Sequence, residues 1–192
     1  MGEIDLKPIL ESLFFVTHTP LKLEALREIF PEWSEEEILS GVRRLQEEYR
    51  EESKGIELVE VAGGYQFRTK PSCAPWISRL KKAKPVKLSQ SALETLAIIA
   101  YQQPIIRAKI EEIRGVDSGW VLRTLLEKGL IKILGRKEIP GRPLVYGTTQ
   151  TFLELFHLKS LDDLPTLKEI QPPASSEETS KEEPSIQNEG GN

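Results

Sequence analysis

The chain repeats its own pattern of apolar and turn residues after a shift of 84 positions, and this repeat restricts the fold more than any other feature of the sequence. A repeat of this length corresponds to one small structural unit that occurs twice. We therefore expect two tandem domains of the same architecture, over residues 1–83 and 84–170. The matched pairs are Pro20 and Pro104, Leu21 and Ile105, Leu26 and Ile110, Ile29 and Ile113, Ser34 and Ser118, Ile38 and Leu122, and Val42 and Leu126.

The first copy begins with three predicted helices. Thr19-Pro20 and Phe30-Pro31 end the first two, because the residue before a proline disfavours helical geometry. Ser34 and Glu37 predict the start of the third helix as a capping box, in which each side chain satisfies the backbone amide of the other. The expected inward faces are Leu6, Ile9, Leu10, Leu13 and Phe14, then Leu23, Leu26 and Ile29, then Ile38, Val42, Leu45 and Tyr49.

A β-hairpin follows these helices. Apolar residues alternate from Ile56 to Val61 and again from Tyr65 to Phe67, and Gly63-Gly64 lies between them as the expected turn. Three helices followed by a hairpin make a winged helix. A core of about 80 residues is marginal, so we expect each unit to gain support from dimerisation and from a small helix at Trp76, Ile77 and Leu80.

The second copy repeats this order. Ser89 or Ser91 caps its first helix, whose expected stripe is Leu93, Leu96, Ala97, Ala100 and Tyr101, and Gln103-Pro104 ends it. Helices at Arg107–Arg114 and Ser118–Lys128 follow, closed by Gly115 and Gly129, with Val121, Leu122, Leu125 and Leu126 facing inward. Ile131 and Ile133 then lead through a long turn, Gly135 to Pro143, to a strand at Leu144–Thr148 and a helix at Thr151–Leu158. The expected fold class is mainly α with small β wings (α+β).

The net charge of −4 comes from the end of the sequence. Residues 173–192 contain five glutamates and one lysine, which leaves 25 bases and 25 acids before them. This end holds Ile186 as its only large apolar side chain, so it cannot bury enough surface to offset the entropy of ordering. We predict that residues 171–192 are a disordered acidic tail and that the chain folds without it.

Several classes of protein are unexpected for this sequence. The apolar runs are too short to cross a membrane and the first residues do not form a basic signal peptide, so we expect a cytoplasmic protein. Cys73, His18 and His157 are too few for a zinc site of cysteine and histidine. No phosphate-binding loop, dinucleotide motif or nucleophile–base pair is present, so we expect no enzyme and no cofactor.

Winged helices often read DNA with the third helix, which requires positive charge. The first copy does not meet this requirement, because residues 34–52 carry seven acids and three arginines. In the second copy, Arg123 and Lys128 on the helix with Arg136 and Lys137 in the wing either make weak, non-specific DNA contacts or only keep the wing soluble. Trp33 and Trp120 lie beside the two third helices and are expected at the edge of the core, or as anchors for a partner.

Four segments carry a family resemblance. They are LSQSALETLAIIAYQQPI at 88–105, EIRGVD at 112–117, GRPLVYGTT at 141–149 and SLDDLP at 160–165. Together they closely resemble the bacterial segregation and condensation protein ScpB family. The resemblance implies two winged helices, homodimerisation through the first unit, and a non-enzymatic subunit of a condensin-like complex with the SMC ATPase and the kleisin ScpA. It also implies a role in chromosome condensation and segregation during cell division, at the nucleoid, with DNA contacted directly or indirectly. The alternative from the residues is a DNA-binding transcriptional regulator.

Two rims of the second unit are the predicted docking surface for the kleisin. One is the helix end Tyr101, Gln102, Gln103, Pro104 and Ile105, and the other is the wing base with Gly141, Arg142, Pro143 and Tyr146. A proline in each rim limits backbone freedom before binding, and tyrosine and arginine are frequent anchors at interfaces. The alternative is that these residues only lock the hairpin onto the first helix of the unit.

Overall fold

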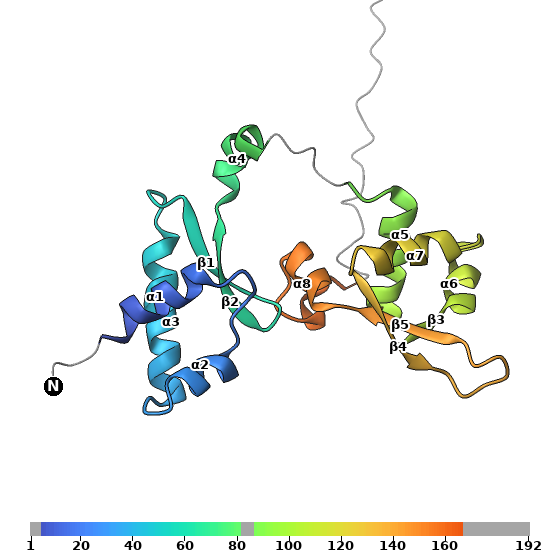
Figure 1. The fold of residues 1–192 in the computed structure, drawn as a ribbon. Coiled ribbons are helices and arrows are strands. Elements are labelled where there is room, and N and C mark those ends of the chain that lie inside the picture. The colour runs from blue at the N-terminus through green and yellow to red at the C-terminus, as the bar shows by residue number, and fades with distance from the viewer. Residues whose placement is uncertain (1–4, 82–86, 167–192) are drawn as a thin grey trace, which may run out of the picture.

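The computed structural model describes residues 5–81 and 87–166, which form two units (Figure 1). The predicted boundary between residues 83 and 84 and the predicted tail at 171–192 lie outside the described residues. The domain limits therefore stay a prediction.

The first unit consists of three helices, a hairpin and two short helical segments. Its core forms where α1 and α3 pack on each other and on the hairpin. The elements are α1 (Leu6–Val16), α2 (Leu23–Ile29), α3 (Glu35–Arg50), β1 (Ile56–Val61), β2 (Gly64–Thr69), η1 (Pro71–Cys73) and α4 (Ala74–Lys81). The buried members of this core cluster are Leu6, Leu10, Phe14, Leu26, Phe30, Ile38, Val42, Leu45 and Leu58.

The boundaries of the three helices agree with the local sequence signals. The capping box of α3 is present, because the Ser34 amide donates to Glu37 Oε2 at 2.8 Å and the Glu37 amide donates to Ser34 Oγ at 3.3 Å. The predicted inward direction of Ile29 is wrong, since this side chain is 47% exposed. Ile29 lies about 120° around the helix from Leu23, and a helix of two turns buries only the side that carries Leu26.

The turn of the hairpin lies one residue earlier than predicted. Val61 pairs with Gly64, so the two loop residues are Ala62 and Gly63, with φ angles of 51° and 72°. A two-residue hairpin turn of this kind requires positive φ at both loop positions. Gly64 is instead the first residue of β2 and lies against the backbone of Leu21.

The second unit has the same order of elements with one extra strand. Its sheet is antiparallel in the order β3-β5-β4, and two winged helices in tandem are thereby confirmed as the fold. Gly115 takes the left-handed conformation after α6, as predicted. The elements are α5 (Gln90–Gln102), β3 (Ile105–Ile106), α6 (Arg107–Arg114), α7 (Gly119–Glu127), β4 (Ile131–Arg136), β5 (Leu144–Thr148), α8 (Gln150–Phe156) and η2 (Leu161–Asp163).

The buried stripe of α5 is rotated from the predicted one. Leu93 and Tyr101 are 40% and 37% exposed, and Ala97 is also exposed. Ser89 is the N-cap, because its hydroxyl accepts from the Ala92 amide at 3.2 Å. Apolar residues occur on most sides of this helix, so α7 and β5, which pack against it, select the inward face. That face consists of Ala92, Thr95, Leu96, Ile99 and Ala100.

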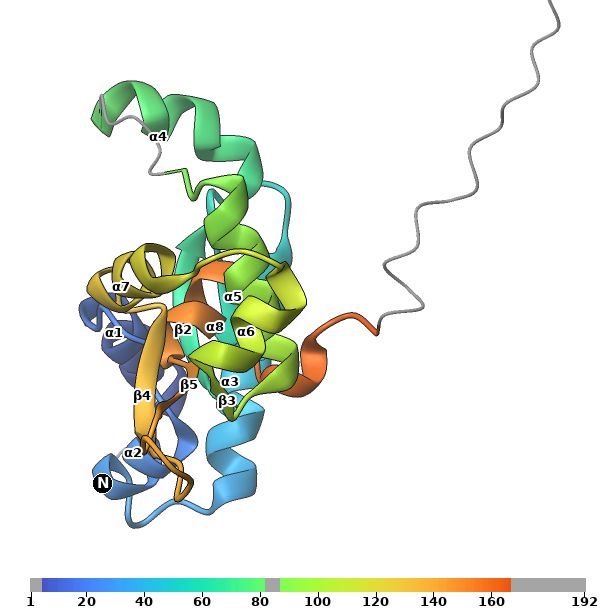
Figure 2. The same cartoon turned by 90° about the vertical axis from the view of Figure 1, so that its right-hand side faces the viewer.

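The small helix α4 does not support the first unit as predicted. Trp76 and Leu80 are 67% and 83% exposed, and Figures 1 and 2 show α4 extending away from α1 and α3. The guanidinium of Arg79 covers the Trp76 ring at 4.8 Å from its centre. Trp76 and Leu80 therefore do not contribute to the core of the first unit.

The two units meet through α8 and the hairpin of the first unit, as Figure 1 shows. The Ala62 amide donates to the Leu158 carbonyl at 2.9 Å, and Arg68 donates to the Glu154 carbonyl at 3.0 Å. An ion pair at 2.8 Å between Lys159 Nζ and Glu60 completes these contacts. We call this set of three polar contacts the joint.

Candidate partner-binding surfaces

The predicted docking residues lie where the end of α5 meets the sheet of the second unit. Ile105 in β3 is opposite Tyr146 in β5, and Ile106 is opposite Val145. Ile105 and Tyr146 are 5% and 7% exposed. These two side chains belong to the core that holds β3 against β5.

Gln103 connects the end of α5 to the end of β5. Its Oε1 accepts from the Thr148 amide at 2.7 Å, and its Nε2 donates to the Thr148 hydroxyl at 2.9 Å. The same Nε2 donates to the Ala100 carbonyl at 3.2 Å. The contacts of Gln103, Ile105 and Tyr146 therefore hold the end of α5 against the hairpin, and we call this set of contacts the lock. Partner contacts by these three residues stay a prediction.

Tyr101, Gln102 and Pro104 are exposed beside this lock. The Tyr101 hydroxyl donates to the Pro165 carbonyl at 2.7 Å, so the segment after α8 returns to α5. This segment is held by Asp163, whose carboxylate accepts from the Lys159 amide at 2.7 Å. The Tyr101 hydroxyl is therefore already engaged, while Gln102 and Pro104 are open to a partner.

A groove of about 630 Å³ begins at Gln102 and Pro104 and continues to the wing. Its apolar part comes from β3, α6 and β5, and Lys109 and Lys137 add positive charge at its sides. Lys109 is paired with Glu112 at 2.7 Å, so Lys137 is the more available of the two cations. The lining residues are Gln102, Pro104, Ile105, Ile106, Ala108, Lys109, Glu112, Lys137 and Val145.

Sequence reasoning missed most of this groove. Ile106, Ala108 and Val145 lie outside the predicted rims, because β3 contains only two residues and has no period to detect. Pairing of Ile105–Ile106 with β5 brings the start of α6 beside the wing. The Pro-Ile-Ile sequence before an expected helix was the available signal.

Arg142, the second predicted anchor, lies at the tip side of the wing. Its φ is 39°, and its carbonyl accepts from the Arg136 guanidinium at 3.0 Å. The Arg142 amide donates to the Ile139 carbonyl at 2.9 Å, which closes the turn. These two hydrogen bonds to the backbone of Arg142 thus hold the wing, while the side chain of Arg142 remains exposed.

The face predicted for weak DNA contact has less available charge than the sequence indicates. Arg123 forms an ion pair with Glu127 at 2.9 Å on the same helix. Lys128, Arg136 and Lys137 are exposed, but they are divided between the end of α7 and the wing. DNA contact by these residues stays a prediction.

The exposed side of α7 is apolar at its start. Trp120 is 71% exposed, so its expected place at the core edge is wrong, whereas Trp33 packs partly against the first core. Val116 and Ile113 nearby in sequence are also about half exposed. A DNA-recognition helix presents polar side chains that hydrogen-bond to base edges. A helix that presents a tryptophan there instead is better suited to contact with protein.

The described part of the chain offers neither a metal-binding group nor a membrane-spanning helix. Within 5–81 and 87–166, no three His, Cys, Asp or Glu side chains form a group that could hold a metal ion. Across the same described residues, none of the helices has the length and apolar character needed to cross a membrane.

Comparison with known proteins decides the family. The family model described as "Segregation and condensation complex subunit ScpB" matches residues 8–167. The chain belongs to the ScpB family. The resemblance seen in the sequence is thereby confirmed, and the match includes both winged helices.

Known ScpB proteins are similar over most of the chain. "Segregation and condensation protein B" of Syntrophotalea carbinolica is 49% identical over 170 residues, which are 88% of this chain and 86% of the relative. The crystal structure of ScpB from Mycobacterium tuberculosis is 34% identical, covers 81% of this chain and 98% of its own, and has a TM-score of 0.38. A dimer of the ScpB N-terminal domain complexed with ScpA peptide is 34% identical, covers 39% of this chain and 93% of its own, and has a TM-score of 0.37.

Proposed function

We propose that the chain is a non-enzymatic subunit of an SMC–kleisin complex that acts as a homodimer, binds the kleisin ScpA and reaches the SMC ATPase through it. Its role is in chromosome condensation and segregation during cell division, in the cytoplasm at the nucleoid. Membership of the ScpB family supports this proposal. The solved N-terminal domain of a relative, a dimer with a ScpA peptide, adds support for both partners through its sequence identity to this chain.

The groove of the second unit is the observation that supports a kleisin site. It combines apolar side chains from β3, α6 and β5 with an available cation, Lys137, at one side. The backbone around it is held by the Gln103–Thr148 contacts. A concave apolar surface with few polar groups that is ordered in advance binds a helical or extended segment at low entropic cost.

Filling the groove tests this function. Ala108 lies exposed on α6 and lines the groove, so Ala108→Trp should occupy it without disturbing the core. We expect titration calorimetry with the purified kleisin to show at least tenfold weaker binding by this variant. Ile113→Trp is the matched control, because Ile113 is exposed on the same helix outside the groove. Equal affinity of both variants and the wild type would exclude the groove as the kleisin site.

The first unit provides an apolar surface for the homodimer. Phe15 and Val16 at the end of α1 are 79% and 66% exposed. Ile9, almost two turns earlier on the same helix, is 36% exposed. Burial of such side chains in a second copy removes their apolar area from water. Light scattering should give twice the 21.8 kDa chain mass, and Phe15→Glu should shift it towards one chain mass. A wild-type monomer at micromolar concentration would contradict the dimer.

The proposed role as a non-enzymatic subunit has its own measurement. We expect the isolated chain to hydrolyse no ATP and to bind neither nucleotide nor zinc tightly, because no motif for either occurs in the sequence. Calorimetry that detected micromolar ATP affinity or stoichiometric zinc would contradict this role.

A further inference from the structure

The segment from the end of α7 to the turn of the wing, residues 128–142, is positively charged, and we call it the basic strip. It carries five bases and one acid, a net charge of +4. Arg123 and Glu127 just before it neutralise each other in an ion pair at 2.9 Å. The charged residues of the strip are Lys128, Lys132, Arg136, Lys137, Glu138 and Arg142.

The cations of the basic strip are exposed and available. Every residue from 132 to 142 is exposed, and Figure 1 shows the hairpin of β4 and β5 projecting from the unit. Within residues 5–81 and 87–166, no carboxylate forms an ion pair with any of the five bases. The described part of the chain therefore leaves the charge of the strip without a partner.

The strip follows the edge of a sheet. In the order β3-β5-β4, β5 is the only strand that pairs with β4 among the described residues. An edge strand presents free backbone groups on one side, which an extended segment can approach. Because the cations are spread along this edge, a second copy of the same strand would bring like charges together. An extended segment with several carboxylates fits instead.

The acidic tail of the same chain, residues 171–192, has the complementary charge. Its five glutamates and one lysine give −4, equal and opposite to the basic strip. Four of the glutamates form two pairs in the sequence, Glu177–Glu178 and Glu182–Glu183. No proline occurs between Pro173 and Pro184, so every backbone amide of that stretch can donate a hydrogen bond.

The tail starts on the unit that carries the strip. The carbonyl of Pro165 accepts from the Tyr101 hydroxyl at 2.7 Å, and the described chain ends at Thr166. Glu177 follows Thr166 by eleven residues, which span up to about 36 Å. A folded unit of this size has a radius of gyration of about 12 Å, so the acids can reach any side of it. Such a tether keeps the acids at an effective concentration of about 1 mM, so weak exposed ion pairs suffice.

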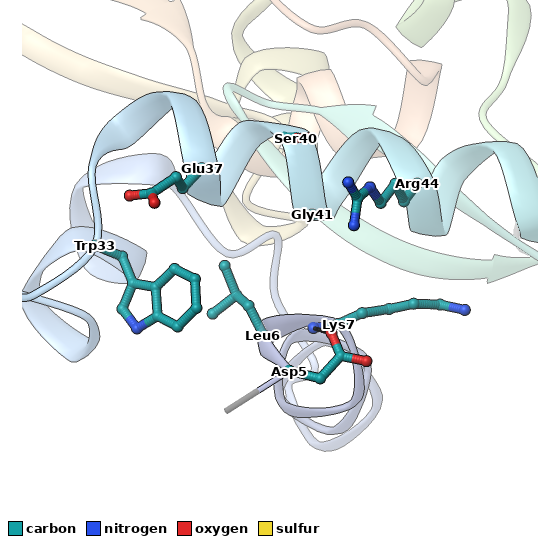
Figure 3. A pocket seen from close by; sticks show the side chains of 8 residues that line it. All are labelled: Asp5, Leu6, Lys7, Trp33, Glu37, Ser40, Gly41 and Arg44. Carbon is teal, nitrogen blue, oxygen red and sulfur yellow. Dashed lines mark hydrogen bonds between the residues drawn. The ribbon is translucent and has the colours of Figure 1, made fainter. Parts of the chain in front are cut away.

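The first unit is less suited to the acidic tail. Its described residues carry 14 acids and 11 bases, whereas those of the second unit carry nine acids and 11 bases. Figure 3 shows the cavity of about 450 Å³ between α1 and α3, where the Arg44 guanidinium lies at the opposite end from Trp33 and Glu37. Asp5 and Glu37 also line this cavity, so the carboxylates of the tail would meet like charges there.

We propose that the acidic tail lies along the basic strip of its own chain, with its glutamate pairs against the cations of β4 and the wing turn. Contact of these cations with any other polyanion, DNA included, then requires displacement of the tail. The inference goes beyond the proposed function, because it does not involve the kleisin.

A spin label in the tail of the full chain tests this contact. Ser180→Cys, in a Cys73→Ser background, provides a single attachment site between the two glutamate pairs. The nitroxide should remove the amide NMR signals of β4 and leave those of α1 and α3 unchanged. A salt concentration of about 1 M should restore the β4 signals, because the Debye length falls from about 8 Å to about 3 Å.

Two changes of charge should restore the β4 signals as well. One replaces the four paired glutamates of the tail with glutamine, which leaves both folded units untouched. The other is Lys132→Glu, at an exposed residue of β4 that does not line the groove of the second unit. Lys87→Glu is the matched control, because Lys87 is exposed in the same unit outside the strip and changes the net charge equally. In this control the β4 signals should stay lost.

Each other outcome overturns the inference in a distinguishable way. Unchanged β4 signals in the labelled protein would show that the tail does not contact the strip. Equal restoration by Lys87→Glu and Lys132→Glu would mean that only net charge matters. Signals that stayed lost at high salt and in the glutamine variant would contradict an electrostatic contact.

Two further measurements identify a different occupant of the strip. In mixed dimers with the spin label on one copy and the isotope on the other, loss of the β4 signals would assign the contact to the tail of the partner copy. Shifts of the β4 signals by duplex DNA that were equal with and without the tail glutamates would make the strip a nucleic-acid surface that the tail does not cover.

Discussion

Gly64 is a residue of the first unit at which neighbouring backbone leaves no room for a side chain. A Cβ atom there would lie 2.9 Å from both the carbonyl carbon and the oxygen of Leu21, which are backbone atoms that cannot rotate away. The same Leu21 exchanges backbone hydrogen bonds of 2.8 and 2.9 Å with Tyr65. The close approach of Leu21 to β2 therefore requires glycine at this position.

We predict that Gly64→Ala lowers the free energy of unfolding by about 2 kcal/mol, the usual cost of overpacking a tight contact. Gly63→Asn is the control from the same hairpin. Gly63 has a φ of 72° and open space around its Cα, and asparagine tolerates this conformation, so its change should stay within about 0.5 kcal/mol. Denaturant unfolding of both variants is the measurement, and equal stability of the two would contradict the steric explanation.

Tyr49 is the residue whose ionisation depends most clearly on the fold. The hydrogen bond from its hydroxyl to the Glu11 carboxylate, together with burial, raises its pKa to about 12. The folded state therefore keeps the phenol proton over a pH range in which the unfolded chain, with a pKa of about 10, releases it.

Tyr49 should consequently stabilise the fold below pH 10 and lose this contribution as the pH rises through about 12. The ultraviolet absorbance of tyrosinate should show a step near pH 12 that is absent from Tyr49→Phe. In Glu11→Gln the step should move to lower pH, because the negative acceptor is gone. A step that did not move in Glu11→Gln would show that Glu11 is not the cause.

At the scale of elements, the junction of α5 with β5 depends on Gln103. Its amide group satisfies the Thr148 amide and hydroxyl and the Ala100 carbonyl at the end of the helix. Thr148 is 8% exposed, so loss of these contacts leaves polar groups with little access to water.

We predict that Gln103→Ala lowers the free energy of unfolding by about 1–3 kcal/mol. The adjacent Gln102 is exposed and lines the groove, so Gln102→Ala should change stability by no more than about 0.5 kcal/mol. Thermal melts compare the two variants, and kleisin titration of Gln102→Ala then reports on binding without a loss of stability. A Gln103→Ala protein as stable as the wild type would show that the lock is unimportant.

At the scale of the whole molecule, the relative position of the two units depends on the joint. One backbone hydrogen bond, one bond from Arg68 and the Lys159–Glu60 ion pair join the hairpin to the region of α8. Exposed ion pairs contribute about 0–1 kcal/mol each, so the joint is weaker than either core.

Lys159→Glu should separate the units without unfolding them, because it places two carboxylates in contact across the joint. Small-angle scattering should give a larger radius of gyration, while the circular dichroism of the helices stays unchanged. Exchange of both charges, in Glu60→Lys with Lys159→Glu, should restore the wild-type value. An unchanged radius in the single variant would mean that the ion pair does not hold the units together.

The sequence by itself determined the order of elements, the duplicated winged helix and most helix ends. Those features depend on neighbours along the chain: the Ser34–Glu37 capping box, the left-handed Gly115 and the change from helical to alternating period after Gly55 are each local. The resemblance to the ScpB family was likewise carried by continuous segments of sequence. The two predicted rims of the second unit also lie on continuous segments of sequence, and their contact with a partner stays a prediction.

Only the tertiary structure decided which faces are buried and which surfaces remain open. α5 has apolar residues on most sides, so its packing against α7 and β5 selects the inward stripe and leaves Tyr101 exposed. β3 is too short to show a period, and it exists because Ile105 and Ile106 pair with residues about 40 positions away. The cavity beside Arg44 depends on the approach of α1 to α3 at Gly41. Contacts between distant segments leave no periodic signal in a single sequence, because each partner satisfies its own local pattern equally well without the other.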